Sequence, residues 1–335
     1  MKKPYDHGKS GRGGRQHARP HSAARHYPRV QAPARAAFSS RPSQDPADRL
    51  FLEGIPVDPS PRMRLEDGLA DPTMRGLDLI CPIGMGQRGL IVAPPGSGKT
   101  TILKHICQAV GRAYPQVKLY CLLIDERPEE VTDFRRSVTA DVRWSSSDLE
   151  YEHHVRTADD LMRQAMREAG AGQHVMVLID SLTRLARVHN AERRSSGRTI
   201  SGGLDARALE VPRRIFGAAR KIEHGGSLTI LATILVQTGS RMDDVIFEEF
   251  KGTGNMEVVL SRDVSSRRIY PAIDVAKSGT RRIELLLEPQ ELDRVNLLRR
   301  ALVQLSPVEA ASVLLEQMQK YPTNRELLEA VGKVM

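Results

Sequence analysis

The stretch 89-GLIVAPPGSGKTTIL-103 joins an apolar run to a glycine-containing turn and an amphipathic segment. The run predicts a buried strand that ends near Ala93, and Ile102 and Ile106 follow the turn at helical spacing. A strand, a glycine turn and a helix in this order are typical of a phosphate-binding loop, where backbone N–H groups and the helix N-terminus surround an anion. The stretch therefore predicts a nucleotide site in an α/β fold.

Within this loop we expect Lys99 to reach the outer phosphates of ATP and the Thr100 hydroxyl to hold Mg²⁺. The strict motif has glycine where Ala93 stands, which exchanges one small residue for another. The residues assigned to nucleotide contact here are Pro95, Gly96, Ser97, Gly98, Lys99, Thr100 and Thr101. Because kinases, switches, transporters and motors share this loop, other residues must show what the nucleotide is used for.

Length and composition limit the class of protein. The chain has 335 residues, of which 40% are hydrophobic, enough for one large domain or two small ones. The longest apolar run, 228-LTILATILV-236, is far shorter than the ~20 residues of a membrane span, so no membrane partner is expected. Cys81, Cys107 and Cys121 lack metal-ligand spacing, which favours reduced core thiols in a cytoplasmic protein.

The positive charge is concentrated at the N-terminus. Residues 1–48 carry ten Lys and Arg against three Asp, so this segment accounts for +7 of the net charge of +9. Val30 is its only Ile, Leu or Val, which predicts a disordered basic tail. With 11-GRGGR-15 and scattered aromatic residues, the tail resembles arms that bind nucleic acid through phosphate charge, and such binding weakens steeply with salt. A solubilising tail is the alternative.

After a Pro- and Asp-punctuated connector at 49–75, apolar runs and helical stretches alternate. The runs 89–93, 117–125, 175–180, 228–236 and 256–260 predict a mostly parallel sheet with helices on both faces, followed by a helical C-terminus. We expect this domain to cover residues 76–335. One of its helices is expected to open at Thr157, with Asp160 three residues later in a capping box.

Ligands bind where the strands of such sheets end, so the polar residues that follow each strand are candidates for the site. In 124-IDERPEEV-131 we assign the base that polarises the attacking water to Glu126, and expect Asp125 to orient its neighbours. In 175-VMVLIDSLTRLAR-187 the acid after the apolar run, Asp180, is expected to reach Mg²⁺. Three glycine-containing loops, 195–203, 237–245 and 278–282, each place an arginine among small residues.

A resemblance becomes specific in longer stretches. The segments 122-LLIDERPEEVT-132, 179-IDSLTRLAR-187, 247-FEEFKGTGNMEVVLSR-262 and 270-YPAIDVAKSGTRRIELLL-287 resemble the motor domain of the bacterial transcription termination factor Rho family, in order and across roughly residues 50–335. This resemblance implies a RecA-like P-loop ATPase that forms a homohexameric ring around single-stranded RNA and moves it with ATP. It also implies RNA polymerase and elongation factors as partners.

The resemblance further implies roles for individual residues. Arg127 and Arg184 would sense the nucleotide state, Tyr270 would stack on adenine, and Arg281 would be an arginine finger that reaches the γ-phosphate of a neighbouring subunit. The residues that match the two RNA-gripping pore loops are Ser196, Gly197 and Arg198, and Thr238, Gly239, Ser240 and Arg241.

The chain departs from the usual family pattern in three places. Arginine stands at 198 and 241 where lysine is usual, Gly96 and Ser97 replace a Lys-Ala pair, and the N-terminal RNA-binding barrel has no counterpart. The leading hypothesis is thus a Rho-type RNA translocase whose basic tail tethers RNA. The alternative is a nucleotide-switched RNA-binding or regulatory protein without translocation.

Overall fold

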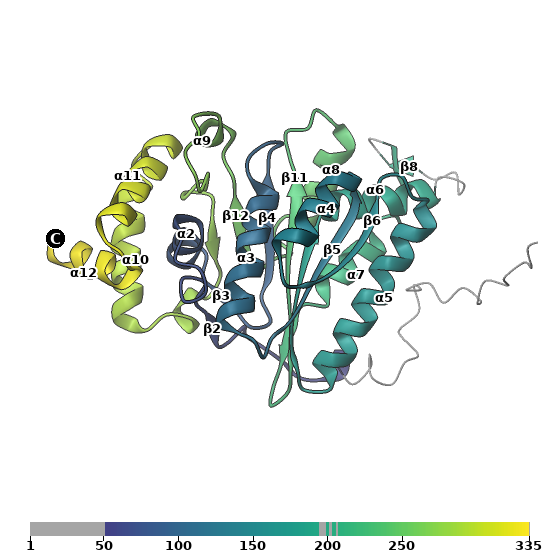
Figure 1. Cartoon of the computed structure of the whole chain (residues 1–335), viewed down its shortest axis with the longest axis horizontal. Helices are drawn as coiled ribbons and strands as arrows, with labels where there is room; N and C mark the ends of the chain where they lie inside the picture. The colour runs from purple at the N-terminus through teal and green to yellow at the C-terminus, as the bar shows by residue number, and fades with distance from the viewer. Residues whose placement is uncertain (1–50, 194–198, 201–202, 206, 335) are drawn as a thin grey trace, which may run out of the picture. The chain divides into compact units, whose positions relative to one another are not determined.

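The computed structural model describes residues 51–334 except 194–198, 201–202 and 206 (Figure 1). The basic tail predicted for residues 1–48 and the predicted RNA contacts Ser196, Gly197 and Arg198 lie outside the described residues, so both stay predictions.

The core of the fold is a nine-stranded sheet. Its main path runs in the spatial order β13 (Gly279–Thr280), β12 (Met256–Val259), β4 (Arg88–Ala93), β11 (Ser227–Leu235), β7 (His174–Asp180), β5 (Lys118–Glu126) and β6 (Asp141–Ser146). From β12 to β6 every neighbouring pair is parallel. The predicted mostly parallel sheet is therefore confirmed, and all five predicted apolar runs are strands.

Short antiparallel strands complete the sheet and form two small ribbons. Strand β10 (Arg220–Ile222) pairs with β11, and β1 (Pro56–Val57) pairs with β10. The ribbons are formed by β2 (Arg62–Met63) with β3 (Ile83–Gly84), and by β8 (Thr199–Ile200) with β9 (Leu204–Asp205).

Helices cover both faces of the sheet (Figure 1). One face packs against α2 (Pro72–Ile80), α3 (Lys99–Ala113) and α4 (Pro128–Ser137), and the same core extends through α2 to α10 (Pro289–Leu302), α11 (Pro307–Lys320) and α12 (Asn324–Val334). The other face packs against α5 (Tyr151–Gly170), α6 (Leu182–Arg193), α7 (Glu210–Gly217) and α8 (Arg241–Phe250). The described residues also include the short helix α9 (Arg262–Ser266) and a 3-10 turn, Ile283–Leu285.

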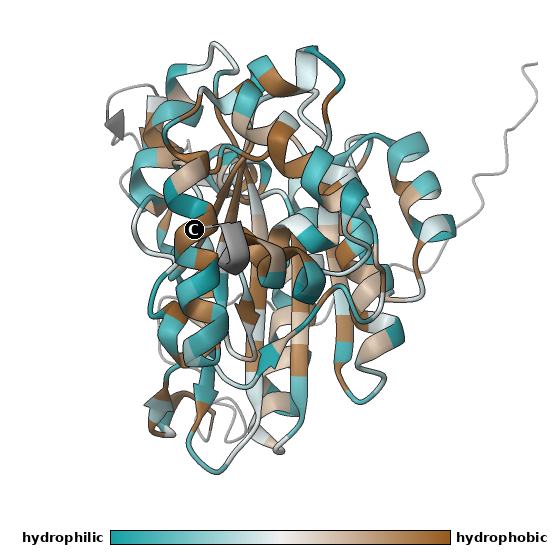
Figure 2. Cartoon of the chain, turned by 90° about the vertical axis from the view of Figure 1, so that its left-hand side faces the viewer, coloured by the Kyte–Doolittle hydropathy of each residue, from teal (hydrophilic) through white to brown (hydrophobic). Residues whose placement is uncertain are grey.

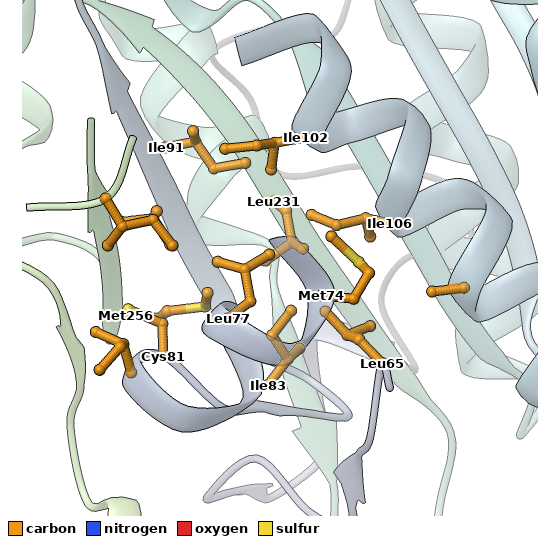
Figure 3. Close-up of a cluster of buried hydrophobic side chains, with 14 of the residues drawn as sticks. Leu65, Met74, Leu77, Cys81, Ile83, Ile91, Ile102, Ile106, Leu231 and Met256 are labelled. Atoms are coloured by element: carbon orange, nitrogen blue, oxygen red, sulfur yellow. The ribbon is translucent and has the colours of Figure 1, made fainter. Parts of the chain in front are cut away.

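Alternation along the strands builds a separate core on each face, because successive side chains of a strand point to opposite sides. On β4, Ile91 belongs to the first core and Leu90 to the second. Figure 3 shows Ile91 and Leu231 of the sheet facing Ile102 and Ile106 of α3, with Met74 of α2 close by. The strands are accordingly the most apolar elements in Figure 2, whereas the helices are striped.

Residues 51–75 of the predicted connector at 49–75 contribute to the two cores and to the sheet rather than forming a separate linker. Gly76, the expected first residue of the domain, lies in the middle of α2. Met63 and Leu65 are buried in the first core, and β1 joins the main sheet. Proline and aspartate make this segment look like a linker locally, but its apolar residues fill the space beneath α2.

The predicted capping box at Thr157 is wrong. Helix α5 begins at Tyr151 with Glu150 as its N-cap, so Thr157 lies inside the helix. There its hydroxyl donates to the carbonyl of His153 at 2.8 Å, an arrangement that satisfies a threonine within a helix. The three cysteines are buried and free as predicted, and Cys107 and Cys121 contact each other with their sulfurs 3.1 Å apart.

Candidate functional site: a nucleotide cavity at the carboxyl edge of the sheet

The phosphate-binding loop has the backbone that an anion site requires. It follows β4, and α3 begins at Lys99 directly after Gly98. Gly96 and Gly98 have φ of +74° and +96°, in the region that favours glycine. Ala93 is not among the positive-φ residues, which explains why alanine is accepted where the strict motif has glycine. The hydroxyl of Ser97 donates to the carbonyl of Pro94 at 2.7 Å and braces the turn.

Three parallel strands bring the predicted catalytic residues to this loop. Strands β4, β5 and β7 end at the same edge of the sheet, since all three are parallel to β11 or to each other. Nζ of Lys99 lies 2.8 Å from both carboxylate oxygens of Asp180 and 3.2 Å from Oε1 of Glu126. The Thr100 hydroxyl donates to Oδ2 of Asp180 at 3.2 Å. The candidate catalytic residues Lys99, Glu126 and Asp180 therefore form one ionic cluster.

A backbone irregularity separates the two acids at the end of β5. The register with β6 shifts between Ile124 and Glu126, and the intervening Asp125 has φ of +56°, a conformation that Asp tolerates better than most residues. Glu126 is buried beside Lys99, whereas the Asp125 side chain keeps about a third of its surface exposed. The bulge thus selects Glu126 as the acid of the ionic cluster.

Arg184 of α6 holds this strand end from the other side. Its guanidinium donates to the main-chain carbonyl of Asp125 and to Oε2 of Glu126, the latter at 3.1 Å. Each oxygen of the Glu126 carboxylate therefore faces a cation, with Lys99 at Oε1 and Arg184 at Oε2. Asp180 is braced in the same way by the Thr233 hydroxyl, which donates to its Oδ1 at 2.7 Å. These contacts fix both carboxylates before any ligand binds.

Burial sets the protonation of the cluster. Burial raises the pKa of Glu126 to about 7, the nearby charge of Asp180 adds to this effect, and Lys99 and Arg184 oppose it. For Lys99, burial alone would lower the pKa, but Asp180 and Glu126 together raise it, so the amine stays charged. A carboxylate with a pKa near neutrality is suited to general-base chemistry at physiological pH.

Lys99 and Glu126 of this cluster line a cavity of about 850 Å³, with Asp180 buried behind them. All the predicted nucleotide-contact residues line it, from Pro95 to Thr101 and also Arg127, Arg184 and Tyr270. The structure adds residues that no sequence motif indicated, namely Thr73, Ile102, His105, Glu130, Leu235, Pro271 and Ala272. They lie on α2, α3, α4, the end of β11 and the segment after Tyr270, and several of them fall within the quoted motifs without having been assigned a role.

The donor set suits Mg²⁺ bound together with a phosphate. Thr100 and Asp180 offer one hydroxyl and one carboxylate to hard cations, which prefer oxygen ligands. In the described part of the chain no three His, Cys, Asp or Glu side chains gather as a metal site. Mg²⁺ commonly takes only one or two protein ligands and fills its shell with phosphate oxygens and water.

Arg281 lies away from this cavity, at the opposite end of β4 and β12. The main-chain N–H of Arg281 donates to the carbonyl of Asn255 at 2.8 Å, and its guanidinium donates to the carbonyl of Gly252 at 3.3 Å. The N–H of Asn255 in turn donates to the carbonyl of Arg88, where β4 begins. The Arg281 side chain is exposed. The structure thus does not bring Arg281 to the ionic cluster of the same chain.

The loop of Thr238, Gly239, Ser240 and Arg241 follows β11 at the carboxyl edge of the sheet. Ser240 caps α8, and Arg241, the first residue of that helix, is exposed. The buried carboxylate of Asp243 accepts from the Thr238 hydroxyl at 2.6 Å and from Nε of Arg187 at 2.8 Å. Since Arg187 and Arg184 are both on α6, that helix contacts the Asp243 carboxylate that holds the loop and also lines the nucleotide cavity.

No helix in the described ranges is long and apolar enough to cross a membrane.

Sequence comparisons identify the chain's relatives. Residues 73–280 match the family model of the ATP synthase alpha/beta family, nucleotide-binding domain. The transcription termination factor Rho of Aquifex aeolicus is 53% identical over 260 residues, which are 77% of this chain and 60% of that protein. The Rho of Karelsulcia muelleri is 48% identical over 77% of this chain and 68% of its own length. The chain thus spans 60 to 68% of the length of these two relatives.

Structure comparisons agree on the fold. An ATPase from the type III secretion system of pathogenic bacteria superposes with a TM-score of 0.66 at 22% identity, over 83% of this chain and 86% of that one. The assembled ATPase EscN of the enteropathogenic E. coli type III secretion system gives a TM-score of 0.66 at 21% identity, over 83% of this chain and 72% of that one. At this identity the likeness shows a shared P-loop α/β fold.

Proposed function

The chain belongs to the transcription termination factor Rho family, and from this premise we propose that it is an RNA-dependent ATPase that moves along single-stranded RNA to terminate transcription. The observation that carries the proposal is the ionic cluster of Lys99, Glu126 and Asp180, of which Lys99 and Glu126 line a cavity of about 850 Å³. A nucleotide switch needs a phosphate-binding loop, but a buried carboxylate with a pKa near neutrality, oriented by two cations, is suited to hydrolysis.

In the proposed reaction Lys99 binds the outer phosphates, and Glu126 accepts the proton of the attacking water. Arg184 keeps the Glu126 carboxylate pointing toward the phosphates, since it binds the oxygen that Lys99 does not contact. Mg²⁺ held by Thr100 and Asp180 would neutralise charge on the phosphate oxygens. On ATP binding, Lys99 would exchange its contacts with the two carboxylates for contacts with phosphate oxygens.

The exposed position of Arg281 supports a site that is shared between subunits. Arg281 lies far from its own cavity, and within the described part of the chain its guanidinium hydrogen-bonds to the carbonyl of Gly252, so it is suited to reach the γ-phosphate bound by a neighbour. We propose a ring of six copies, as the family resemblance implies, with Arg127 and Arg184 responding to the nucleotide and Tyr270 stacking on its base.

RNA contact is assigned to the two loops that contain Arg198 and Arg241. Arg241 is exposed, and Asp243, two residues later, binds Arg187 of α6. Arg184 of the same helix binds Glu126, so a shift of the loop on RNA binding would be transmitted through α6 to Glu126. The proposed partners are single-stranded RNA, further copies of the chain, and RNA polymerase with its elongation factors. This set of partners would place the protein in the cytoplasm.

The test is ATP turnover with and without poly-cytidine RNA, measured on the full chain whose oligomeric state is determined in parallel. We expect RNA to stimulate turnover, and Glu126→Gln to reduce it by about 10²–10⁴-fold while ATP binding persists. Glu129→Gln is the matched control, because Glu129 is exposed on the same turn and does not line the cavity. RNA binding without any RNA-stimulated turnover would favour the regulatory alternative instead.

A further inference from the structure

Thr233 places a hydroxyl group in the buried interior of the sheet. It lies on β11, the strand between β4 and β7, and it is fully buried. The register pairs Ala232 with Ile179, so the next residues of the two strands, Thr233 and Asp180, lie side by side. The following residue of β11, Ile234, is apolar. Because a buried hydroxyl without a hydrogen bond is costly, the partner of Thr233 matters for the fold.

The Thr233 hydroxyl is committed to one oxygen of the Asp180 carboxylate. It donates to Oδ1 at 2.7 Å, whereas the carbonyl of Ile179 lies 3.4 Å away. A hydroxyl has one proton to donate, and a carboxylate is the stronger acceptor of the two. The other oxygen, Oδ2, accepts from the Thr100 hydroxyl at 3.2 Å. The two threonines bond to different oxygens and therefore restrict rotation of the carboxylate about its Cβ–Cγ bond.

The contact with Thr233 becomes more important when a nucleotide binds. Lys99 contacts both oxygens of Asp180, and in the proposed reaction it leaves them for the phosphates. Among the described residues, the side chains that then still hydrogen-bond to this carboxylate are Thr100 and Thr233. Thr100 lines the cavity and is itself an expected ligand of Mg²⁺, whereas Thr233 does not line the cavity. Thr233 can therefore act on the site only through Asp180.

We propose that Thr233 is a positioning residue that sets the Mg²⁺ affinity of the nucleotide site, by holding the Asp180 carboxylate with Oδ2 turned toward Thr100. Removing a hydrogen-bond partner of a metal ligand typically lowers metal affinity by about 10–100-fold. The inference rests on the proposed function, since it requires Mg²⁺ and a nucleotide in this cavity. It adds the residue that orients the metal ligand.

The experiment measures the affinity of the full chain for ADP by isothermal titration calorimetry, once in excess Mg²⁺ and once in EDTA. The ratio of the two affinities reports contact between protein and metal, because the affinity of Mg²⁺ for free ADP is the same for every variant. Thr233→Val replaces the hydroxyl by a methyl group and should lower this ratio by about 10-fold. Thr233→Ser keeps the donor and should leave the ratio close to that of the wild type.

Thr229→Val is the matched control. Thr229 is buried on the same strand and the same face of the sheet, four residues or about 13 Å before Thr233. Its hydroxyl accepts the N–H of Gly86 at 2.8 Å, so this variant also loses a buried hydrogen bond. Both valine variants should lower the thermal unfolding temperature, but only Thr233→Val should lower the ADP ratio. In turnover assays Thr233→Val should raise the Mg²⁺ concentration for half-maximal rate, and excess Mg²⁺ should restore most of kcat.

The outcomes distinguish this inference from the proposed function. An unchanged or higher ratio in Thr233→Val, an equal loss in Thr229→Val, or a loss in Thr233→Ser as large as in Thr233→Val overturns the positioning role and leaves the ATPase proposal standing. Failure of the wild-type chain to bind ADP overturns the nucleotide site itself. If Thr233→Val does not fold, Thr233→Cys decides by the same ratio, because a thiol is only a weak donor.

Discussion

Lys99 and Asp180 form an ion pair where the nucleotide phosphates are expected to bind: Nζ of Lys99 is 2.8 Å from each oxygen of the carboxylate. The Asp180 side chain is 1% exposed and that of Lys99 18%, so neither charge is well solvated. Until a nucleotide binds, each charge is therefore stabilised mainly by the other rather than by water. The pair thus contributes to the stability of the fold as well as to nucleotide binding.

Lys99→Met should remove ATP binding and also destabilise the chain. It leaves Asp180 and Glu126 as two buried acids without their shared cation, and breaking a buried pair in this way costs about 3–5 kcal/mol, less what protonation of Glu126 recovers. The measurement is the free energy of unfolding in urea at pH 7. Lys104→Met is the control, because its partner Asp133 is exposed, and it should change stability by at most about 1 kcal/mol. Equal effects of the two substitutions would contradict the prediction.

Turnover should depend on pH through Glu126, whose pKa is about 7 in the folded chain. The base acts only when ionised, so kcat should rise about tenfold per pH unit below pH 7 and level off above it. The check is a pH–rate profile from pH 5 to 9 with saturating ATP and RNA. A flat profile below pH 7 would remove Glu126 from the role of base.

The free energy of unfolding should fall as pH rises over part of the range in which turnover increases. Glu126 keeps its proton to higher pH in the folded chain than in the unfolded chain, where its pKa is near 4.5. The folded state therefore binds more protons between pH 4.5 and 7, and the free energy of unfolding falls as pH rises through this window, by a few kcal/mol at most, about 1.4 per unit of pKa shift. Glu126→Gln should reduce this slope in urea unfolding curves.

Arg281→Ala and Glu126→Gln should each abolish turnover alone and complement one another when mixed. If the finger and the base at one site come from different subunits, a mixed ring contains sites with an intact Glu126 from one copy and an intact Arg281 from the next. Random 1:1 mixing makes about a quarter of the interfaces complete, and turnover should recover to a comparable fraction. Arg282→Ala, next to Arg281, is the control and should remain active. Mixtures as inactive as the single variants would exclude a shared site.

Asp243→Asn should uncouple RNA from hydrolysis. The buried Asp243 carboxylate joins Thr238 in the predicted RNA loop to Arg187 of α6, and the amide cannot accept from both nitrogens of that guanidinium. We expect basal turnover to persist, whereas stimulation by RNA falls by about tenfold, the result of losing 1–2 kcal/mol of coupling. Asp244→Asn, at an exposed position of the same turn, should keep the stimulation.

Most of the local architecture could be predicted from the sequence. The apolar runs and the glycine turn after Ala93 depend on neighbouring residues only, so they identified five of the six parallel strands, the phosphate-binding loop and the acids that end β5 and β7, but not the more polar edge strand β6. Local signals misled in two places: Met63 and Leu65 of the predicted connector are buried in the core beneath α2, and α5 begins at Tyr151 rather than Thr157.

The sequence by itself determined which residue types stand at the strand ends, because strand periodicity is encoded within each segment. Only the tertiary structure decided that the bulge at Asp125 directs Glu126 to Lys99. It also decided that His105 lines the nucleotide cavity with Asp71 next to it, and that Arg281 lies at the far end of the sheet. These relationships join segments tens to hundreds of residues apart, and their distances depend on strand order and helix packing, which no single stretch of the chain contains.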